Sequence, residues 1–395
     1  MQGTPGAQTP KVPDSTSEQS LRAVRRPFET IAPTTWDRLA AANQWATPFS
    51  GWAFHRAWWD AYGAHAHEQT FVAIPAVGPD DAEPVAILPL MHRHEVEPDD
   101  AILRTRLRGD PGRGMTAVAP TAKAVFLGAT YHADYATLLT APADLPAAAD
   151  ALAAALADPA GHGDADPTPW DVVDLRRLRS ADPTVDALES AFRARAAAEG
   201  WVVTREREDV CPVVTIAMDA GFEDYLGRLG KKERHEIRRK IRRAEAAGSV
   251  ELALSPDPVA ELDAFVDLHQ QRWGADGLFP ATPGGEQSRF FFRRLFELGG
   301  DSRTIQLRFL TVEGRRIAAG VWFEDDQAIY FYNAGADPEA SELSPGVLLS
   351  ARAISTAIEE GRRRFDYLRG DEPYKYEWGA VDEPIERLLV VRAAG

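Results

Sequence analysis

Hydrophobic and polar positions along the chain switch repeatedly between helical spacing and short extended runs. Large aromatic residues recur at helical spacing over Trp52–Tyr62, which predicts a helix there. Two apolar runs follow, Phe71–Ile74 and Pro84–Met91, and together they predict a hairpin. Further strands are predicted at Ala101–Leu107, Lys123–Leu127, Thr137–Thr140 and Asp171–Leu175. The first half of the chain is therefore expected to begin with a helix and extended segments.

Two helices are predicted in the rest of this half. An alanine-rich segment places Leu145, Leu152 and Leu156 on one face, which predicts an amphipathic helix. The segment Thr184–Gly200 predicts a second helix, because Gly200 can adopt the left-handed conformation that commonly ends one. The strand predicted at Asp171–Leu175 lies between these two helices.

The second half repeats this order of elements. Helices are predicted near Val259–Trp273 and Gln287–Leu298, and they are followed by a hairpin with its turn at Glu313-Gly314. The remaining elements are the hairpin strands Thr304–Val312 and Ile317–Glu324, the strand Ala328–Asn333, the helix Ser344–Glu360 and the strand Arg364–Leu368. Both halves thus show helix, hairpin, strand, helix and strand, which predicts an internal duplication joined near Val210–Pro212.

Length and composition fit this organisation. The chain has 395 residues, of which 45% are hydrophobic and 26% charged, as expected of a globular protein with about two domains. Residues 1–26 contain few large apolar side chains, so a disordered tail is expected there. We expect two domains, residues 27–211 and residues 212–395, each with an α/β fold of mixed (α+β) sheets flanked by helices.

Net charge and cysteine content exclude several classes of protein. The formal charge of −16 argues against a protein that binds nucleic acid over its whole surface. The single cysteine, Cys211, allows no internal disulfide and no zinc cluster. His92 and its neighbours lie on a predicted strand and alternate between its faces, so no metal site is expected. No run of about 18 apolar residues occurs, so we expect no export, no membrane insertion and a cytoplasmic location.

The segment Lys231–Arg243 carries eight Lys and Arg against two Glu, in contrast to the acidic chain. Ile237 and Ile241 fall on one helical face and are expected to point inward. The arginines expected to point outward are Arg238, Arg239, Arg242 and Arg243. Two interpretations remain, a solvated helix face or a docking surface for the phosphates of a cofactor, a nucleotide-linked substrate or tRNA. Under the second, Arg238 and Arg242 are candidate cofactor-binding residues.

A second candidate site joins the end of a strand to the start of a helix. Serine is a frequent N-cap, proline suits the first helical turn and glycine permits close approach of a ligand, which is the order of Ser344, Pro345 and Gly346. Free amide groups at a helix start attract a pyrophosphate. The candidate cofactor-binding residues here are Tyr332, Asn333, Ser344, Gly346 and Val347. An ordinary capped helix is the structural alternative.

The run Asp371–Gly379 holds more acids, tyrosines and basic groups than a plain connection requires. This run, the basic segment and the phrases Phe126-Leu127-Gly128, Asp134-Tyr135 and Cys211-Pro212 together resemble the CelD/BcsL group of GNAT-like acetyltransferases, which are related to the FemABX peptidyltransferases. Lys375, Trp378 and Gly379 also match the lysine-x-x-aromatic-glycine ending of FemABX proteins.

The resemblance implies two tandem GNAT-like domains. The second domain would bind the acyl donor, and the acceptor would lie near the cleft between the domains. In such a fold the thioester arm lies between two diverging strands, here Tyr330–Asn333 and Arg364–Leu368. The donor pyrophosphate lies at the start of the helix that follows the first of them, here Ser344–Val347.

The resemblance also implies an acyltransferase that moves an acyl group, with acetyl favoured, from acetyl-CoA or another acyl-CoA to an amine or hydroxyl. A small-molecule or glycan-precursor acceptor in polysaccharide or envelope biosynthesis is expected. The candidate catalytic residues are Asp371, Glu372, Tyr374, Lys375 and Tyr376. The acids would act as bases, a tyrosine would protonate the leaving thiolate, and Lys375 would stabilise oxyanion or phosphate charge. Alternatively, the acids are structural and pair with Arg369 or Lys375.

Two other functions remain open. The same fold could use aminoacyl-tRNA, as FemABX proteins do, with the basic segment holding RNA phosphates, although the acidic total charge weighs against this. The protein could instead be a non-catalytic partner in an envelope or polysaccharide pathway, in which case Asp371–Gly379 would be structural. The sequence decides neither the acyl donor, nor the acceptor, nor the oligomeric state.

Overall fold

The computed structural model describes residues 20–93, 115–119, 121–129, 131–158, 170–217, 221–300 and 304–392. The strand predicted at Ala101–Leu107 lies outside these residues. Leu21–Arg25, expected to belong to a disordered tail, instead form strand β1, antiparallel to β3 (Phe71–Pro75). The expected start of the folded chain at Pro27 is therefore wrong, because backbone pairing with β3 orders a segment that has few large apolar side chains.

The helices of the first half are α1 (Pro33–Ala42), α2 (Trp52–Tyr62), α3 (Leu145–Ala157) and α4 (Pro183–Glu199). Gly200 ends α4 with a φ of 66°, as its position in the sequence predicted. Short 3-10 helices lie at Phe28–Thr30, Pro48–Ser50, Gly63–His65, Gly274–Asp276 and Pro338–Leu343. The helices of the second half are α5 (Phe222–Arg228), α6 (Lys231–Ala247), α7 (Leu262–Trp273), α8 (Pro283–Gly299), α9 (Pro345–Glu359) and α10 (Pro373–Glu377).

Two sheets are present in the described part of the chain. The smaller has the order β1-β3-β4-β7, with β4 at Ala86–Leu88 and β7 at Leu139–Thr140. The larger has eleven strands in the order β10-β11-β12-β13-β14-β9-β15-β8-β6-β5-β2. Its strands are β2 (His67–Glu68), β5 (Leu90–Arg93), β6 (Ala124–Leu127), β8 (Val172–Arg179), β9 (Trp201–Thr215), β10 (Val250–Leu254), β11 (Ile305–Val312), β12 (Arg315–Glu324), β13 (Ala328–Ala336), β14 (Arg364–Asp366) and β15 (Val381–Arg392).

The predicted strand Pro84–Met91 is divided between these two sheets. Pro89 separates β4 from β5, since proline has no N–H to donate to a sheet. Its carbonyl instead accepts a hydrogen bond from the N–H of Gly128 at 2.7 Å.

Each half contains one unit of two parallel strands whose connection contains a helix. In the first half α3 lies between β6 and β8 in the chain, and in the second half α9 lies between β13 and β14. The two halves do not form the separate sheets expected from the sequence. The last strand of the first half, β9, pairs with β14 of the second half, and the last strand of the chain, β15, pairs with β8 of the first half.

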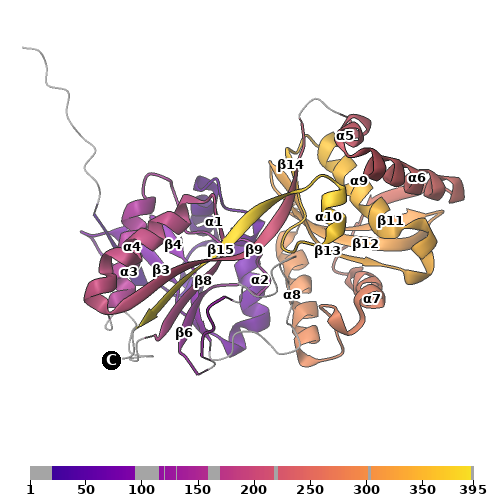
Figure 1. Ribbon diagram of the computed structural model, residues 1–395. Coiled ribbons are helices and arrows are strands. Elements are labelled where there is room, and N and C mark those ends of the chain that lie inside the picture. The colour runs from indigo at the N-terminus through magenta and orange to yellow at the C-terminus, as the bar shows by residue number, and fades with distance from the viewer. Residues whose placement is uncertain are drawn as a thin grey trace, which may run out of the picture.

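These exchanged strands also pair with each other, so they run side by side across the junction between the halves (Figure 1). The expected domain boundary near Val210–Pro212 therefore lies inside a continuous strand. A single shared sheet is the physical result, because each half provides the hydrogen-bonding edge that the other half's final strand needs.

In the second half, helices cover both faces of the sheet. Helices α5, α6 and α9 pack on one face through a cluster that includes Leu226, Ile237 and Leu348, and α7 and α8 pack on the other through Phe265 and Phe292. The second of these clusters continues into the first half through α2. The core is thus continuous between the halves on the α7 and α8 side of the sheet.

Candidate active site

Strands β13 and β14 run parallel but pair only briefly. Their pairing joins Ala328–Tyr330 to Arg364–Asp366 and ends there. In β13, Asn333 lies opposite Val321 and Phe331 lies opposite Trp322, so Tyr332 is the extra residue of a β-bulge. The chain after β14 turns away through Leu368, which has a φ of 57°. The opening between Tyr332 and Leu368 is called the strand wedge below, and it lies where the sequence predicted two diverging strands.

Helix α9 begins beside this region. Ser344 occupies the N-cap position in a left-handed conformation, and its carbonyl accepts hydrogen bonds from the N–H groups of Val347 and Leu348. The Ser344 hydroxyl does not cap the helix. Its oxygen accepts a 2.8 Å hydrogen bond from the guanidinium of Arg243 on α6. Gly346 is exposed, and a Cβ added there would meet no atom within 4 Å. The guanidinium of Arg243 therefore lies at the exposed start of α9, beside the positive end of the helix dipole.

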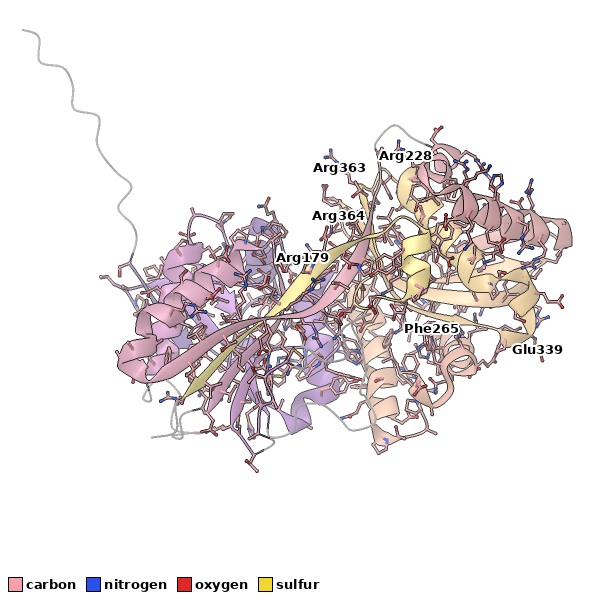
Figure 2. The ribbon with its side chains drawn as sticks, viewed as in Figure 1. Arg179, Arg228, Phe265, Glu339, Arg363 and Arg364 are labelled. Carbon is pink, nitrogen blue, oxygen red and sulfur yellow. The ribbon has the colours of Figure 1, made fainter. Side chains whose placement is uncertain are left out.

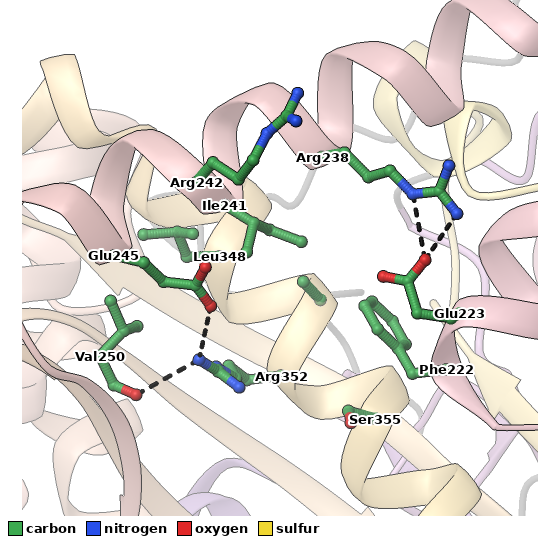
Figure 3. A pocket seen from close by; sticks show the side chains of 11 residues that line it. Phe222, Glu223, Arg238, Ile241, Arg242, Glu245, Val250, Leu348, Arg352 and Ser355 are labelled. Atoms are coloured by element: carbon green, nitrogen blue, oxygen red, sulfur yellow. Dashed lines mark hydrogen bonds and ion pairs between the residues drawn. The ribbon is translucent and has the colours of Figure 1, made fainter.

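The orientation predicted for the basic segment is confirmed for Ile237, Arg239 and Arg242 but only in part for Arg238 and Arg243, which are partly exposed. Ile237 is buried and Ile241 is half-buried against the cluster around α9, whereas Arg239 and Arg242 are exposed. Arg238 is only partly exposed because its Nε donates to Glu223 at 3.1 Å. Arg238 and Arg242 both line a pocket of about 250 Å³ between α5, α6 and α9 (Figure 3).

Tyr332 and Asn333 make contacts within the protein at the wedge. The Asn333 side-chain oxygen accepts a 3.0 Å hydrogen bond from the N–H of Ala334. The Tyr332 hydroxyl donates to the carbonyl of His132 in the first half, and the Nδ1 of the same histidine lies 3.0 Å from that hydroxyl. Tyr332 thus joins the two halves at the wedge.

His132 lies at the centre of a buried hydrogen-bond network. Its Nε2 lies 2.8 Å from the Tyr62 hydroxyl, which in turn is 3.1 Å from the Ser288 hydroxyl on α8. Its ring stacks on Phe291 with centroids 4.2 Å apart. Burial, with a smaller contribution from the Arg369 charge, lowers the pKa of His132 to about 3. The imidazole is therefore neutral at neutral pH, in agreement with one nitrogen donating and the other accepting.

The neighbouring residues of this loop reach the other side of the wedge. The Asp134 carboxylate accepts from the guanidinium of Arg369, and each side chain is only 10% exposed. The Tyr135 hydroxyl donates to Asp366 at 2.8 Å, and the N–H of Leu368 donates to the second oxygen of the same carboxylate. Burial raises the pKa of Asp366. Loop residues 131–135 of the first half therefore contact both strands of the wedge.

Arg179 completes this side of the junction. Arg179 lies where the two halves meet (Figure 2). Its guanidinium carbon lies 3.8 Å from the centre of the Tyr135 ring, and a terminal nitrogen lies 3.8 Å from Asp366. Cys211, also buried here, has a thiol whose pKa is raised by burial and by nearby acids. A protonated, enclosed thiol does not suit a nucleophile.

Lys375 lies behind the wedge and is only 3% exposed. Its ammonium donates to the carbonyls of Leu368, Arg369 and Gly370 at 3.1, 2.7 and 2.9 Å, and it pairs with Glu372 at 2.9 Å. An ammonium has three N–H donors, so these partners occupy all of them. This environment favours a positioning role, in which Lys375 shapes the turn that carries Arg369, over the oxyanion role expected from the sequence.

The other expected catalytic residues surround this lysine or face outward. Glu372 is exposed except for its pairing with Lys375, and Asp371 is partly exposed. Tyr374 is 45% exposed, and its ring meets Tyr367 edge-on. Tyr376 donates its hydroxyl to Asp382 at 2.7 Å. Sequence reasoning thus found the turn behind the wedge and named Arg369 only as a structural partner of its acids. It did not select His132, which follows the predicted strand Lys123–Leu127, or Asp366, which lies within the predicted strand Arg364–Leu368.

Comparison with known proteins agrees with this geometry. Residues 231–376, less than half of the chain, match the model of a family described as an acetyltransferase (GNAT) domain. The matched segment contains α6, the wedge and the turn held by Lys375. No curated protein matches the sequence. The CelD/BcsL group suggested by the sequence motifs therefore stays a prediction.

Solved structures resemble this chain at low sequence identity, and two of those described here have TM-scores above 0.5. The crystal structure of FemX has a TM-score of 0.56 and 10% identity, and the match covers 90% of this chain and 96% of that chain. A conserved protein of unknown function from Bacteroides thetaiotaomicron has a TM-score of 0.52 and 14% identity, with 92% and 98% of the two chains covered. A tandem GNAT protein from the clavulanic acid biosynthesis pathway has a TM-score of 0.49 and 11% identity, with 95% and 99% covered.

The fold is a mixed α/β arrangement of tandem GNAT-like domains, and the matched domain supports an acyltransferase. In the part of the chain that the structure describes, no helix is both long and apolar enough to span a membrane. Among the same residues, no group of three or more His, Cys, Asp or Glu could hold a metal ion.

Proposed function

We propose that the protein transfers an acyl group, with acetyl favoured, from an acyl-CoA to an amine or hydroxyl at the strand wedge. The observation that carries the proposal is the separation of β13 from β14 inside the segment that matches an acetyltransferase domain. A thioester arm between these strands would lie along the part of β13 that continues past its pairing with β14, where backbone N–H groups would polarise its carbonyl.

The donor's phosphates would bind at the start of α9. Ser344, Gly346 and Val347 present the positive end of this helix, and Arg243 brings a guanidinium to the Ser344 hydroxyl. A guanidinium beside the N–H group of Gly346 suits a pyrophosphate, because both donate to its oxygens. Arg238 and Arg242, further back along α6, add positive charge on the same side.

The acceptor would approach from the other side of the wedge, where the first half meets α7 and α8. The attacking amine or hydroxyl must lose a proton, and Asp134 is our candidate for the base because its loop contacts both strands of the wedge. Arg369, its partner, would stabilise charge that develops on the thioester oxygen. Asp371 and Glu372 remain the competing assignment, with Glu372 already engaged by Lys375.

We further propose that the protein acts in the cytoplasm on a glycan-precursor acceptor. Its role would then lie in polysaccharide or envelope biosynthesis. A second candidate uses aminoacyl-tRNA as the donor, supported by the basic helix α6 and by the fold shared with FemX. The charge of −16 weighs against it, because RNA binding depends strongly on phosphate attraction.

Acyl transfer by the purified chain tests the proposal directly. The protein is incubated with acetyl-CoA or with charged tRNA and a set of amine and hydroxyl acceptors, and transferred groups are detected by mass spectrometry. We expect Asp134→Asn to lower acetyl transfer by about 10²-fold, the usual scale for a positioned base. Asp150→Asn, which removes an exposed acid paired with Arg195, is the matched control. Failure to bind or use either donor would favour the non-catalytic alternative.

A further inference from the structure

The pocket between α5, α6 and α9 is separate from the strand wedge. It has a volume of about 250 Å³ and is lined on α9 by residues such as Leu348 and Arg352, one to two turns after the helix start (Figure 3). Pockets for drug-sized ligands usually measure roughly 300–1,000 Å³, so this one suits a small molecule or one end of a larger one.

Charged groups surround the pocket unevenly. Arg238 donates to Glu223, and Arg352 lies 3.6 Å from Glu245 and 3.4 Å from the carbonyl of Val250, as the dashed lines of Figure 3 show. These partners hold two guanidinium groups in fixed positions. Arg242 is exposed, and among the residues that the structure describes no ion pair for it is found. One guanidinium is therefore available to a ligand, beside two that are already oriented.

Apart from Ser355, the rest of the lining is apolar. Leu348 is buried, and Phe222 and Ile241 are half-buried packing residues of the cluster around α9. A ligand that contacts both the apolar lining and the guanidinium of Arg242 needs an apolar body and one anionic group. Guanidinium groups match the oxygens of either a phosphate or a carboxylate two at a time, and of these two anions the proposed donor carries phosphate. Glu223 and Glu245 would oppose a second buried phosphate but would accept hydrogen bonds from a ligand N–H group.

We propose that this pocket binds the nucleoside phosphate end of the acyl donor. The inference rests on the proposed function, since the pocket lining on α9 begins at Leu348, one turn after Ser344, and Arg243 of α6 reaches Ser344 at the helix start. A donor whose pyrophosphate lies at Ser344 can continue along α6, where its base lies on the apolar surface and a remaining phosphate pairs with Arg242. Contacts with the basic helix α6 would therefore favour binding of a nucleotide-linked thioester over a thioester that lacks a nucleotide.

Calorimetric titration of the full-length protein with adenosine 3′,5′-bisphosphate tests this. We expect saturable binding that Arg242→Ala weakens at least tenfold. The matched control is Arg239→Ala, which removes the same charge from the exposed face of the same helix, where Arg239 pairs with Glu236. That control is expected to change the affinity by less than twofold. Both positions are exposed, so neither variant is expected to unfold the protein.

Several outcomes would overturn the pocket assignment. These are the absence of saturable binding, an equal loss in both variants, binding of inorganic phosphate as tight as that of the nucleotide, or at least tenfold tighter binding of a short 5′-phosphorylated RNA. Acetyl transfer measured on the same samples separates the two proposals. Normal transfer without nucleotide binding would refute only the pocket, and nucleotide binding without thioester binding or transfer would refute only the proposed function.

Discussion

Lys375 determines the local shape of the chain after β14. Three successive carbonyls can point at one ammonium only if the backbone coils tightly, and Leu368 and Gly370 take φ values of 57° and 105°. A leucine in the left-handed backbone conformation costs about 1 kcal/mol or more in conformational energy. The charge-assisted hydrogen bonds from Lys375 offset this cost. The result is a fixed direction for Arg369, which lies between these two residues and reaches Asp134.

Replacing Lys375 with methionine should therefore reduce stability before it affects chemistry. Three buried carbonyls would lose a charged donor, so we expect a loss of about 3 kcal/mol in the free energy of unfolding, measured by urea denaturation. Lys232→Met, at an exposed position on α6, should change this free energy by less than about 0.5 kcal/mol. Unchanged stability with a large loss of turnover would instead support the catalytic role that the sequence motifs suggested.

His132 should make stability depend on pH. The pKa of its ring falls from 6.5 to about 3 in the folded chain, so between these values the unfolded chain binds the proton more readily. The stabilisation is complete above pH 6.5 and is lost as the pH falls, by about 2 kcal/mol between pH 6.5 and 5. His132→Gln, which removes the titrating group, should lose correspondingly less stability than the parent over this range.

Urea titrations at pH 7 and pH 5 measure that difference. His55 and His269, whose pKa values burial lowers to about 3 and about 4, remain in both proteins and cancel in the comparison. His235→Gln changes an exposed ring on α6 and is the control. Equal losses in the parent and in His132→Gln would show that this ring is not the neutral group described here.

At the scale of elements, the sequence predicted those that local periodicity determines. Helices α2, α4 and α9 and the hairpin of β11 and β12 were all predicted within a few residues of their bounds. Strands β9 and β15 were not, because the middle of β9 is a polar stretch without apolar alternation. Its charges are satisfied by distant partners, as in the pairs of Arg205 with Glu386 and of Glu208 with Arg177. Glu386 belongs to the second half, so this partner of Arg205 exists only after the halves have met.

The candidate site likewise has one part that could be predicted from the sequence and one part that could not. Ser344, Gly346 and the arginines of α6 could be proposed from sequence because each belongs to a short contiguous motif. The pair of Asp134 and Arg369 joins positions 235 residues apart, and Tyr332 reaches His132 across 200. No local pattern encodes these contacts, because they follow from the placement of one half against the other. Only the family phrase Asp134-Tyr135 indicated the first half's contribution.

Two glycines on neighbouring elements should respond oppositely to alanine. A Cβ at Gly335 on β13 would lie 2.3 Å from the backbone nitrogen of His269 on α7, whereas one at Gly346 on α9 would meet nothing within 4 Å. We expect Gly335→Ala to cost about 2 kcal/mol in thermal or urea unfolding, because the strand and helix must move apart. Gly346→Ala should keep or slightly raise stability, since alanine favours a helix.

Enzyme kinetics add a second readout to this glycine pair. If a donor phosphate approaches the start of α9, the added methyl group at Gly346 should raise the KM for acetyl-CoA severalfold without loss of stability. A KM equal to that of the parent would remove Gly346 from the donor site, while a large loss of stability in Gly346→Ala would contradict the open surroundings of this residue.

At the scale of the whole molecule, the exchanged strands make each half incomplete alone. Without β15 the edge of β8 is unpaired, and without β9 the same is true of β14. Unpaired edges of a large sheet are open to aggregation, so a stable fold requires both final strands. The site has the same dependence, because the wedge belongs to the second half while His132 and Asp134 belong to the first.

This dependence predicts where the chain can be divided. Two co-expressed fragments, 1–217 and 218–395, keep β9 whole, so we expect them to associate and melt within a few degrees of the intact chain. Fragments 1–211 and 212–395, cut at the boundary expected from the sequence, divide β9 and separate its first eleven residues from Val213–Thr215, which pair with β14. We expect this second pair to aggregate or to melt roughly 10 °C lower, as measured by co-purification and calorimetry. Equal behaviour of the two pairs would mean that the halves are independent domains, and the shared sheet would then contribute little to stability.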